Sequence, residues 1–345
     1  MPRTTPPRPL DVAAVLPELT ALRRTATRLH PRRGTPTVRD SSVGGPMLWP
    51  ADEPWPVCAH AHKRGSGHRY AEVLRAREIL ERAWRRDPRS GPNAGEADEL
   101  SRLKRGRHAP HLADTDPIPL IGVAQLYRRD VPGLPDTGAG DLLQVFWCPF
   151  ERHGESGHEM HVELRWRHSR GIGRPLAEQP FPEVVGRPEL VPSPCVLHPE
   201  VVVEYPWFED LPEDLRQRIE AIEAWETPRE DGHDQTGEEG EGGVERYVFD
   251  LSTAPGWKVG GCIAWNLTGP TRLTCPVCAA RLTPLLTVDR REWDSGTTGW
   301  IPEQDRDAVH VMDANVPTGV SPGRGRLIIA VCPRDPHHPF RLVTQ

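Results

Sequence analysis

The sequence contains almost no lysine and no long hydrophobic segment. Only three of the 43 basic residues are lysines, namely Lys63, Lys104 and Lys258. No apolar run approaches the roughly 18 residues that a membrane-spanning helix needs, so we expect no membrane span. The N-terminal residues are rich in proline and arginine and lack the hydrophobic region of a secretory signal. We therefore expect a cytoplasmic protein in a reducing compartment, where paired cysteines indicate metal sites rather than disulfides.

The charge balance is acidic, and the motifs of several enzyme classes are absent. The 43 basic residues are outnumbered by 49 acidic ones, which gives a net charge of −6. This balance argues against a binder of nucleic acid or of anionic membranes. The excess of arginine over lysine is typical of a GC-rich genome, and we do not read it as a phosphate site. The sequence has no H-E-x-x-H, G-x-S-x-G or P-loop motif, so we predict no catalytic residue.

Proline and glycine are abundant, with 39 and 31 residues, which predicts many loops and short strands. Apolar residues at helical spacing predict one long helix over residues 70–86. Apolar or alternating runs predict strands over residues 118–127, 141–147 and 160–166. The expected fold class is therefore α+β, mainly antiparallel β, with helical insertions.

Three short motifs occur in the same order in both halves of the chain. Val43-Gly44-Gly45-x-x-x-Trp49 matches Val259-Gly260-Gly261-x-x-x-Trp265, Pro119-Leu120-Ile121-x-Val123 matches Pro284-Leu285-Leu286-x-Val288, and Gly140-x-Leu142 before Cys148-Pro149 matches Gly325-x-Leu327 before Cys332-Pro333. Ordered repetition of this kind predicts an internally duplicated β-rich unit. In each unit the glycine pair allows a tight turn, and the tryptophan is expected to pack on the sheet.

These motifs also carry a resemblance to a known family. Ser42-Val-Gly-Gly-Pro-x-Leu-x-Pro followed by Trp55-Pro56, then Gly-Asp-Leu-Leu-Gln-Val-Phe at 140–146 and Trp257-Lys-Val-Gly-Gly261, resembles the YwqG-like family of bacterial proteins. The resemblance spans roughly residues 40–345, apart from a helical insert and an acidic linker. It implies a duplicated α+β fold and, because some members lie among toxin–immunity genes, a protein-binding role. The Cys/His clusters of this chain depart from the simplest members of the family.

Composition and the repeat together predict four parts. An N-terminal helix and extension occupies residues 1–40. The first repeat covers 41–225 and contains a helical insert over 57–116. An acidic, glycine-rich linker over 226–243 is expected to be disordered. The second repeat, with a zinc knuckle, covers 244–345.

The strongest chemical signal is Cys275-Pro-Val-Cys278, a C-x-x-C pair whose spacing suits two thiolate ligands of one tetrahedral Zn²⁺. Cys332 and His338, which follow a strong apolar strand, complete a four-residue set. His337 offers nearly the same spacing as His338, and sequence alone does not separate the two. A redox C-x-x-C is the rival interpretation, but no βαβ pattern surrounds it. Four protein ligands leave no open position, so the predicted ion is structural.

The repeat suggests a second metal site in the first half. The candidate ligands are Cys58, His62, Cys148 and His153, which lie at places corresponding to those of the second-half set. Further cysteine and histidine side chains compete for places in this set, and spacing leaves the choice open; they are His60, Cys195 and His198. The remaining cysteine, Cys262, lies in an apolar run and is interpreted as a core thiol.

The favoured hypothesis is a soluble, zinc-stabilised binding protein of unknown ligand, with an immunity-like or regulatory role toward a protein partner. The alternative is a zinc-dependent hydrolase that uses the first-half cluster, with Glu151 or Glu159 as the base. A zinc-ribbon binder of nucleic acid is disfavoured by the acidic charge. The sequence leaves the ligand, the partner and the oligomeric state open.

Overall fold

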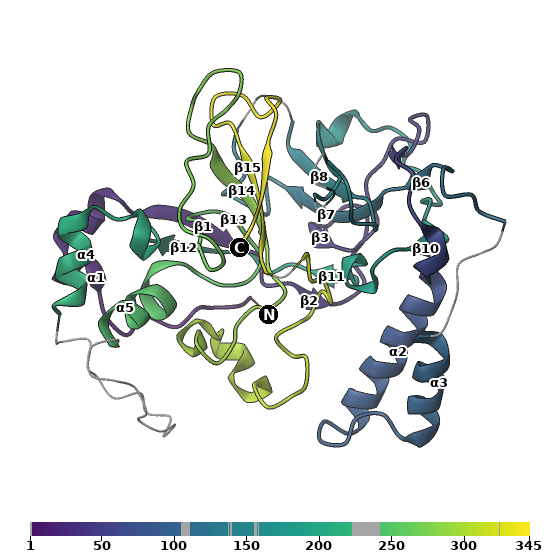
Figure 1. Cartoon of the computed structure of the whole chain (residues 1–345), viewed down its shortest axis with the longest axis horizontal. Helices are drawn as coiled ribbons and strands as arrows, with labels where there is room; N and C mark the ends of the chain where they lie inside the picture. The colour runs from purple at the N-terminus through teal and green to yellow at the C-terminus, as the bar shows by residue number, and fades with distance from the viewer. Residues whose placement is uncertain are drawn as a thin grey trace.

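The framework consists of two six-stranded antiparallel sheets (Figure 1). We call them sheet I and sheet II. Sheet I contains, in spatial order, β2 (Arg32–Arg33), β11 (Cys195–Val196), β3 (Ser42–Val43), β7 (Ile121–Tyr127), β8 (Leu142–Trp147) and β9 (Val162–Arg167). Sheet II contains β12 (Glu200–Glu204), β1 (Arg24–Arg28), β13 (Lys258–Gly260), β14 (Thr283–Val288), β15 (Leu327–Val331) and β16 (Arg341–Thr344). The predicted α+β class with mainly antiparallel strands is confirmed.

This computed structural model describes residues 2–104, 111–136, 138, 140–154, 157, 159–222, 242–323 and 325–345. The predicted linker at 226–243 falls almost entirely outside these ranges. Two short strand pairs flank sheet I, namely β4 (Val57–Cys58) with β6 (Ile118–Pro119) and β5 (His68–Arg69) with β10 (Val184–Val185). The α-helices are α1 (Val12–Val15), α2 (Tyr70–Arg86), α3 (Ala94–Lys104), α4 (Glu213–Glu220) and α5 (Gly242–Arg246), which continues into a π-helical turn at Tyr247–Ser252.

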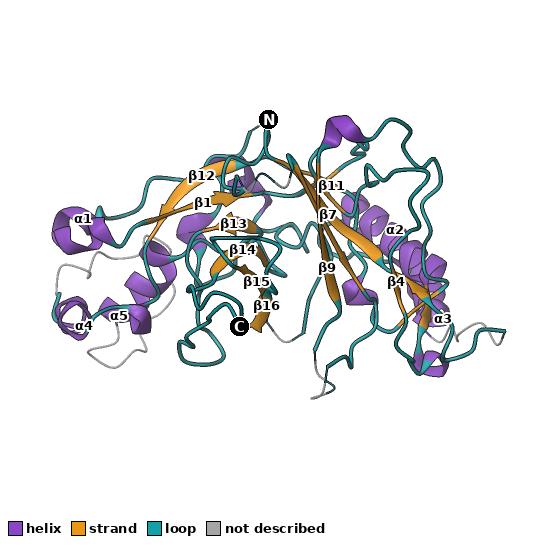
Figure 2. Cartoon of the chain, turned by 90° about the horizontal axis from the view of Figure 1, so that it is seen from above, coloured by secondary structure: helices purple, strands orange, loops and turns teal. Residues whose placement is uncertain are grey.

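The longest helix, α2, follows directly from its sequence. Val73 and Ala83 of the predicted apolar face are buried, as helical spacing predicts, and Ile79 beside them is buried too, whereas Ala76, Leu80 and Trp84 of that face are half-buried. Glu72 in the first turn and the arginines of the last turn complement the helix dipole. Seen from above, α2 and α3 lie beyond sheet I, whereas α1, α4 and α5 lie beyond sheet II (Figure 2). Among the described residues, no helix combines the length and the hydrophobicity needed to cross a bilayer.

One hydrophobic core joins the two sheets. Val123 and Val145 of sheet I belong to the same buried cluster as Leu286 and Ile329 of sheet II. Each such side chain contributes about 1.5–3 kcal/mol when it is removed from water. The strong strands β7, β8, β14 and β15 are therefore held by shared packing, and their ends provide fixed positions for the loops that follow them.

The N-terminal region contributes more than the predicted helix and extension, because β1 belongs to sheet II and β2 to sheet I. The polar and small residues of β1 carry no alternating apolar signal, which is why the sequence did not predict this strand. The segment containing β11 and β12 crosses between the sheets in the opposite direction. Both crossings have the same tripeptide, Leu29-His30-Pro31 in one and Leu197-His198-Pro199 in the other.

The sheets have corresponding orders, with β3, β7, β8 and β9 in the places of β13, β14, β15 and β16. Ala124 lies opposite Val43, and Leu286 lies opposite Val259. When the two sheets are aligned by this register, Pro284 of β14 corresponds to Gly122 of β7. The sequence motif instead aligns Pro284 with Pro119, so the structural and sequence alignments of these strands differ by three residues. Duplication of an ancestral unit stays a prediction.

Candidate metal centres

The first cluster forms where β4 meets the end of β8. Cys58 lies opposite Ile118 in the β4–β6 pair. The chain then passes directly into β7, where Ile121 pairs with Trp147 of β8. Cys148 follows Trp147, so hydrogen bonding along two neighbouring strand pairs carries Cys58 and Cys148 to the same place. His62 and His153 reach the site from the loops after these cysteines.

The structure brings Cys58, His62, Cys148 and His153 together, with their ligand atoms all within 4.8 Å of one another. The Cys58 Sγ atom lies 3.5 Å from His62 Nε2 and 3.4 Å from His153 Nε2. Cys148 Sγ lies 3.6 Å from His62 Nε2. A tetrahedral ion with metal–sulfur bonds of ~2.3 Å and metal–nitrogen bonds of ~2.0 Å requires sulfur–nitrogen separations of ~3.5 Å. The first cluster therefore has the dimensions of a tetrahedral metal site.

The surroundings of this cluster favour a thiolate at Cys58 and a neutral imidazole at His62, whereas the hydrogen bond to Cys58, together with burial, raises the pKa of Cys148. All four side chains are buried, and the His62 ring stacks on Phe150 with centroids 4.9 Å apart. Burial, together with the neighbouring His153, lowers the pKa of His62 and favours the neutral imidazole. A hydrogen bond from the Cys148 thiol, followed by those from the two histidines, lowers the pKa of Cys58. A thiolate and neutral imidazoles are the forms that act as ligands.

The structure also separates the competing residues of the first half. His60 is exposed, and its Nδ1 atom lies 3.8 Å from Cys58 Sγ, at the edge of the cluster. Cys195 lies in β11, where its thiol donates to the Pro317 carbonyl at 3.4 Å. Burial raises the pKa of Cys195 to about 12. Neither Cys195 nor His198 belongs to the four-residue cluster.

The second cluster caps the ends of β14 and β15. It contains Cys275, Cys278, Cys332 and His338, again with all ligand atoms within 4.8 Å of one another. Cys275 Sγ lies 3.3 Å from His338 Nδ1, and Cys278 Sγ lies 3.4 Å from Cys332 Sγ. The other ring nitrogen of His338 faces the Asp335 carboxylate at 3.7 Å, an outer contact of the kind that orients metal-bound histidines. His337 is exposed and lies outside the cluster.

Backbone geometry distinguishes the five clustered cysteines from the other two. Each clustered sulfur accepts a hydrogen bond from the backbone N–H two residues later in the chain. The donors are His60 for Cys58, Phe150 for Cys148, Val277 for Cys275, Ala280 for Cys278 and Arg334 for Cys332. Such donors stabilise a negatively charged sulfur. Cys195 and Cys262 lie outside both clusters, and burial raises the pKa of each to about 12.

Glu151 and Glu159, the candidate bases of the hydrolase alternative, do not belong to the first cluster. Glu151 forms an ion pair with Arg187. Glu159 is exposed, and its backbone pairs with that of His153. Four protein ligands fill a tetrahedral sphere, whereas a catalytic metal keeps a position for water or substrate. Each cluster thus offers the four ligands that a structural metal site needs.

A buried cluster of ionisable side chains lies beside the crossing between the two sheets, and the sequence did not predict it. His30 Nε2 lies 3.0 Å from Glu200 Oε2, and His30 Nδ1 lies 3.7 Å from Glu292 Oε2. Arg28 is fully buried and donates to the Trp300 carbonyl at 2.9 Å. Burial lowers the pKa of His30 to about 3 and raises that of Glu292 to about 7. The repeated Leu-His-Pro tripeptide was the available signal, because it marks both crossings between the sheets.

Comparison of the sequence with protein-family models and with curated proteins finds no match. The two Cys/His clusters, each able to hold a metal ion, are therefore the observations that bear on function.

Proposed function

We propose that this chain is a zinc-stabilised binding protein, in which each Cys/His cluster holds one structural Zn²⁺ and the rest of the surface serves recognition of a protein partner. The observation that carries the proposal is the pair of closed four-ligand sets. Cys₂His₂ and Cys₃His are both donor sets of structural zinc sites, and soft thiolates with imidazole suit Zn²⁺. An immunity-like or regulatory role is what the resemblance to the YwqG-like family adds to the proposal.

Zn²⁺ at these positions would join segments that are far apart in the sequence. The first cluster links the β4 strand to the loop after β8, and the second links the knuckle at 275–278 to the loop after β15. The hydrolase alternative needs a water on the metal, for which a fourth protein ligand would have to leave. The proposed role of both ions is therefore to fix loops rather than to activate water.

Metal content per chain tests the proposal. Native mass spectrometry of the full-length protein should find two zinc ions, and zinc X-ray absorption should report mixed sulfur and nitrogen ligation. Cys58→Ser and Cys278→Ser should each lose one ion. Cys262→Ser is the matched control, since this buried cysteine lies outside both clusters, and it should keep both. A folded wild-type chain without metal, or equal zinc loss in all three variants, would contradict the proposal.

A further inference from the structure

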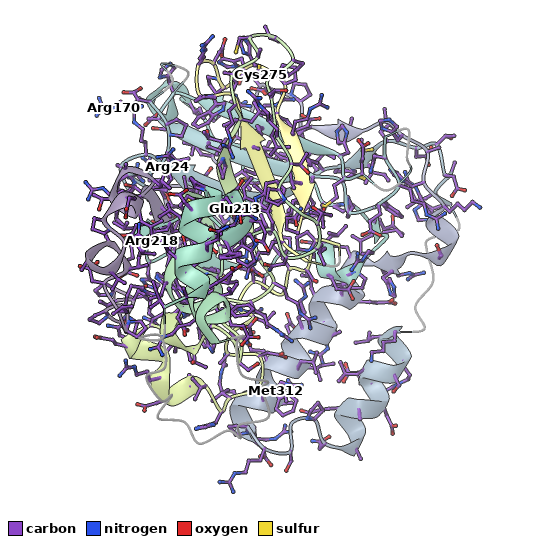
Figure 3. All side chains as sticks on the ribbon, turned by 60° about the vertical axis from the view of Figure 1, so that its left-hand side comes forward. Arg24, Arg170, Glu213, Arg218, Cys275 and Met312 are labelled. Atoms are coloured by element: carbon purple, nitrogen blue, oxygen red, sulfur yellow. The ribbon has the colours of Figure 1, made fainter. Side chains whose placement is uncertain are left out.

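A cleft of about 1230 Å³ lies on the opposite side of the molecule from the second metal cluster. Figure 3 shows Cys275 at one end and Met312, which lines the cleft, near the other. The lining comes from α2, from β2, from the turn after β14 and from the segment before β15. Its volume exceeds the 300–1,000 Å³ range typical of small-molecule pockets. The cleft is thus large enough for an extended ligand.

The charge of the cleft is opposite to that of the whole chain. Eight arginines and five carboxylate residues line it, although acidic residues outnumber basic ones in the sequence. Most of these carboxylates already accept hydrogen bonds or form ion pairs within the protein. Asp289 accepts from Arg326 at 2.5 Å and from the backbone N–H of Arg291 at 3.3 Å. Asp294 accepts from the N–H groups of its own turn.

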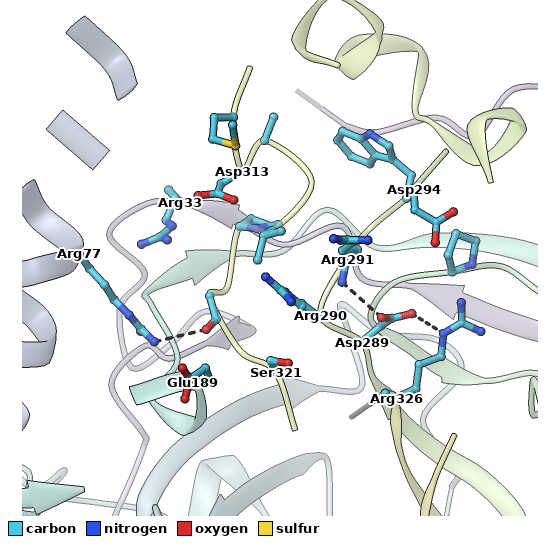
Figure 4. Close-up of a pocket in the computed structure, with 18 of the residues that line it drawn as sticks. Arg33, Arg77, Glu189, Asp289, Arg290, Arg291, Asp294, Asp313, Ser321 and Arg326 are labelled. Carbon is cyan, nitrogen blue, oxygen red and sulfur yellow. Dashed lines mark hydrogen bonds and ion pairs between the residues drawn. The ribbon is translucent and has the colours of Figure 1, made fainter. Parts of the chain in front are cut away.

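Three of the arginines that line the cleft form no ion pair with a carboxylate of the described residues. They are Arg33, Arg290 and Arg291, and all three are exposed. Figure 4 shows Arg290 and Arg291 in the middle of the lining, between Arg77 and Arg326. Guanidinium groups bind carboxylates through two parallel hydrogen bonds, so these side chains are available for an anionic ligand.

Arg77 shows that the positive charge is under-compensated. It is half-buried, and among the described residues its guanidinium donates to neutral oxygens alone, namely Ser193 Oγ at 3.1 Å and the carbonyls of Pro188 and Gly319 at 2.7 and 3.3 Å. Burial and the nearby charge of Arg33 lower the pKa of Arg77 to about 10. A cation held away from water without a counterion is stabilised when an anion arrives.

The cleft also exposes apolar side chains. Leu267 and Met312 are 54% and 53% exposed, and Val311 is 38% exposed. Leu80 and Trp84 of α2 line the same cleft. Grouped apolar exposure beside unpaired cations suits a ligand with both negative and apolar side chains.

We propose that this cleft binds an acidic segment of a protein partner, with carboxylates on Arg33, Arg290 and Arg291 and apolar side chains against Met312 and its neighbours. The inference rests on the proposed function as a protein-binding molecule, and it names the chemistry of the segment recognised. Because guanidinium pairs at an open cleft are screened by salt, binding weakens as ionic strength rises.

The test uses the full-length, metal-loaded protein and a short fluorescein-labelled peptide rich in glutamate and leucine. Fluorescence anisotropy at low salt should detect binding of this peptide. A counterpart with lysine for glutamate should not bind, and one with serine for leucine should bind more weakly. The double variant Arg290→Glu/Arg291→Glu should raise Kd at least about tenfold, the effect of losing one good charge contact.

The matched control is Arg39→Glu/Arg170→Glu, which changes net charge equally at two exposed residues outside the cleft, and its Kd should stay within about twofold of the wild type. Absence of wild-type binding, or equal losses in both double variants, would overturn the proposal. So would equal binding of the serine peptide together with displacement by inorganic pyrophosphate, because that result describes a site for small anions. Zinc analysis of the same samples separates the outcomes, since retained zinc without peptide binding counts against the cleft and not against the metal sites.

Discussion

The substitution Cys278→Ser should unfold the second metal cluster locally while leaving sheet II intact. The knuckle lies beyond the shared core, above a small cluster whose buried members are Cys275, Leu282, Ala330 and Cys332. The strands beneath it belong to the large core, through Leu286 of β14 and Ile329 of β15 among others. The structure thus predicts an effect that is restricted to the knuckle and the loop that faces it.

The magnitude follows from what holds residues 273–282. Fixing the backbone of these residues costs on the order of 10 kcal/mol. Burial of Leu282 returns about 2 kcal/mol. The three hydrogen bonds Cys275 N–H to Ala280, Ala279 N–H to Cys275 and Leu282 N–H to Leu273 return about 1 kcal/mol each. A structural zinc contributes about 10 kcal/mol or more, so the knuckle is ordered with metal and unfolded by several kcal/mol without it.

Hydrogen–deuterium exchange of the full-length variant, beside chelator-treated wild type, measures this difference. Fast exchange should be confined to residues 273–282 and to the loop after Cys332, with β14 and β15 still protected. Cys262→Ser controls for the loss of a buried thiol and should keep slow exchange in the knuckle. Unchanged protection of residues 273–282 in a sample proven to be free of metal would refute the reasoning.

Three further outcomes are expected. Lys258→Ala should lower the unfolding free energy by about 3–5 kcal/mol, because it leaves Glu204, which is 0% exposed and lies 2.6 Å from Lys258 Nζ, without its cation; in urea titrations the exposed control Lys63→Ala should change it by less than about 0.5 kcal/mol. Glu292→Gln should gain stability relative to wild type by on the order of 3 kcal/mol as pH rises from about 4.5 to about 7. The reason is that burial raises the pKa of Glu292 to about 7, so the folded protein holds a proton that the unfolded chain releases; a constant difference across this range would contradict that assignment. His62→Ala should release the first metal ion whereas His60→Ala should retain it, and the reverse result in metal analysis would exchange their roles.

The sequence by itself predicted features that depend on short stretches of chain. The period of apolar residues determined helix α2 with its observed bounds. The C-x-x-C spacing of Cys275 and Cys278 predicted a knuckle, because two thiolates three residues apart can face one ion without help from the rest of the fold. The apolar run before Cys332 likewise predicted the strand that presents this cysteine.

The tertiary structure decided whatever depends on strands that meet from distant parts of the chain. His62, rather than His60, belongs to the first cluster because the β4–β6 pair fixes the direction in which its loop approaches Cys148. The crossing of the chain from β1 in sheet II to β2 in sheet I has no apolar period to predict it, since main-chain hydrogen bonds pair strands without regard to side-chain type. The charged cleft arises in the same way, because its arginines are scattered over the sequence and only the tertiary structure gathers them around one cleft.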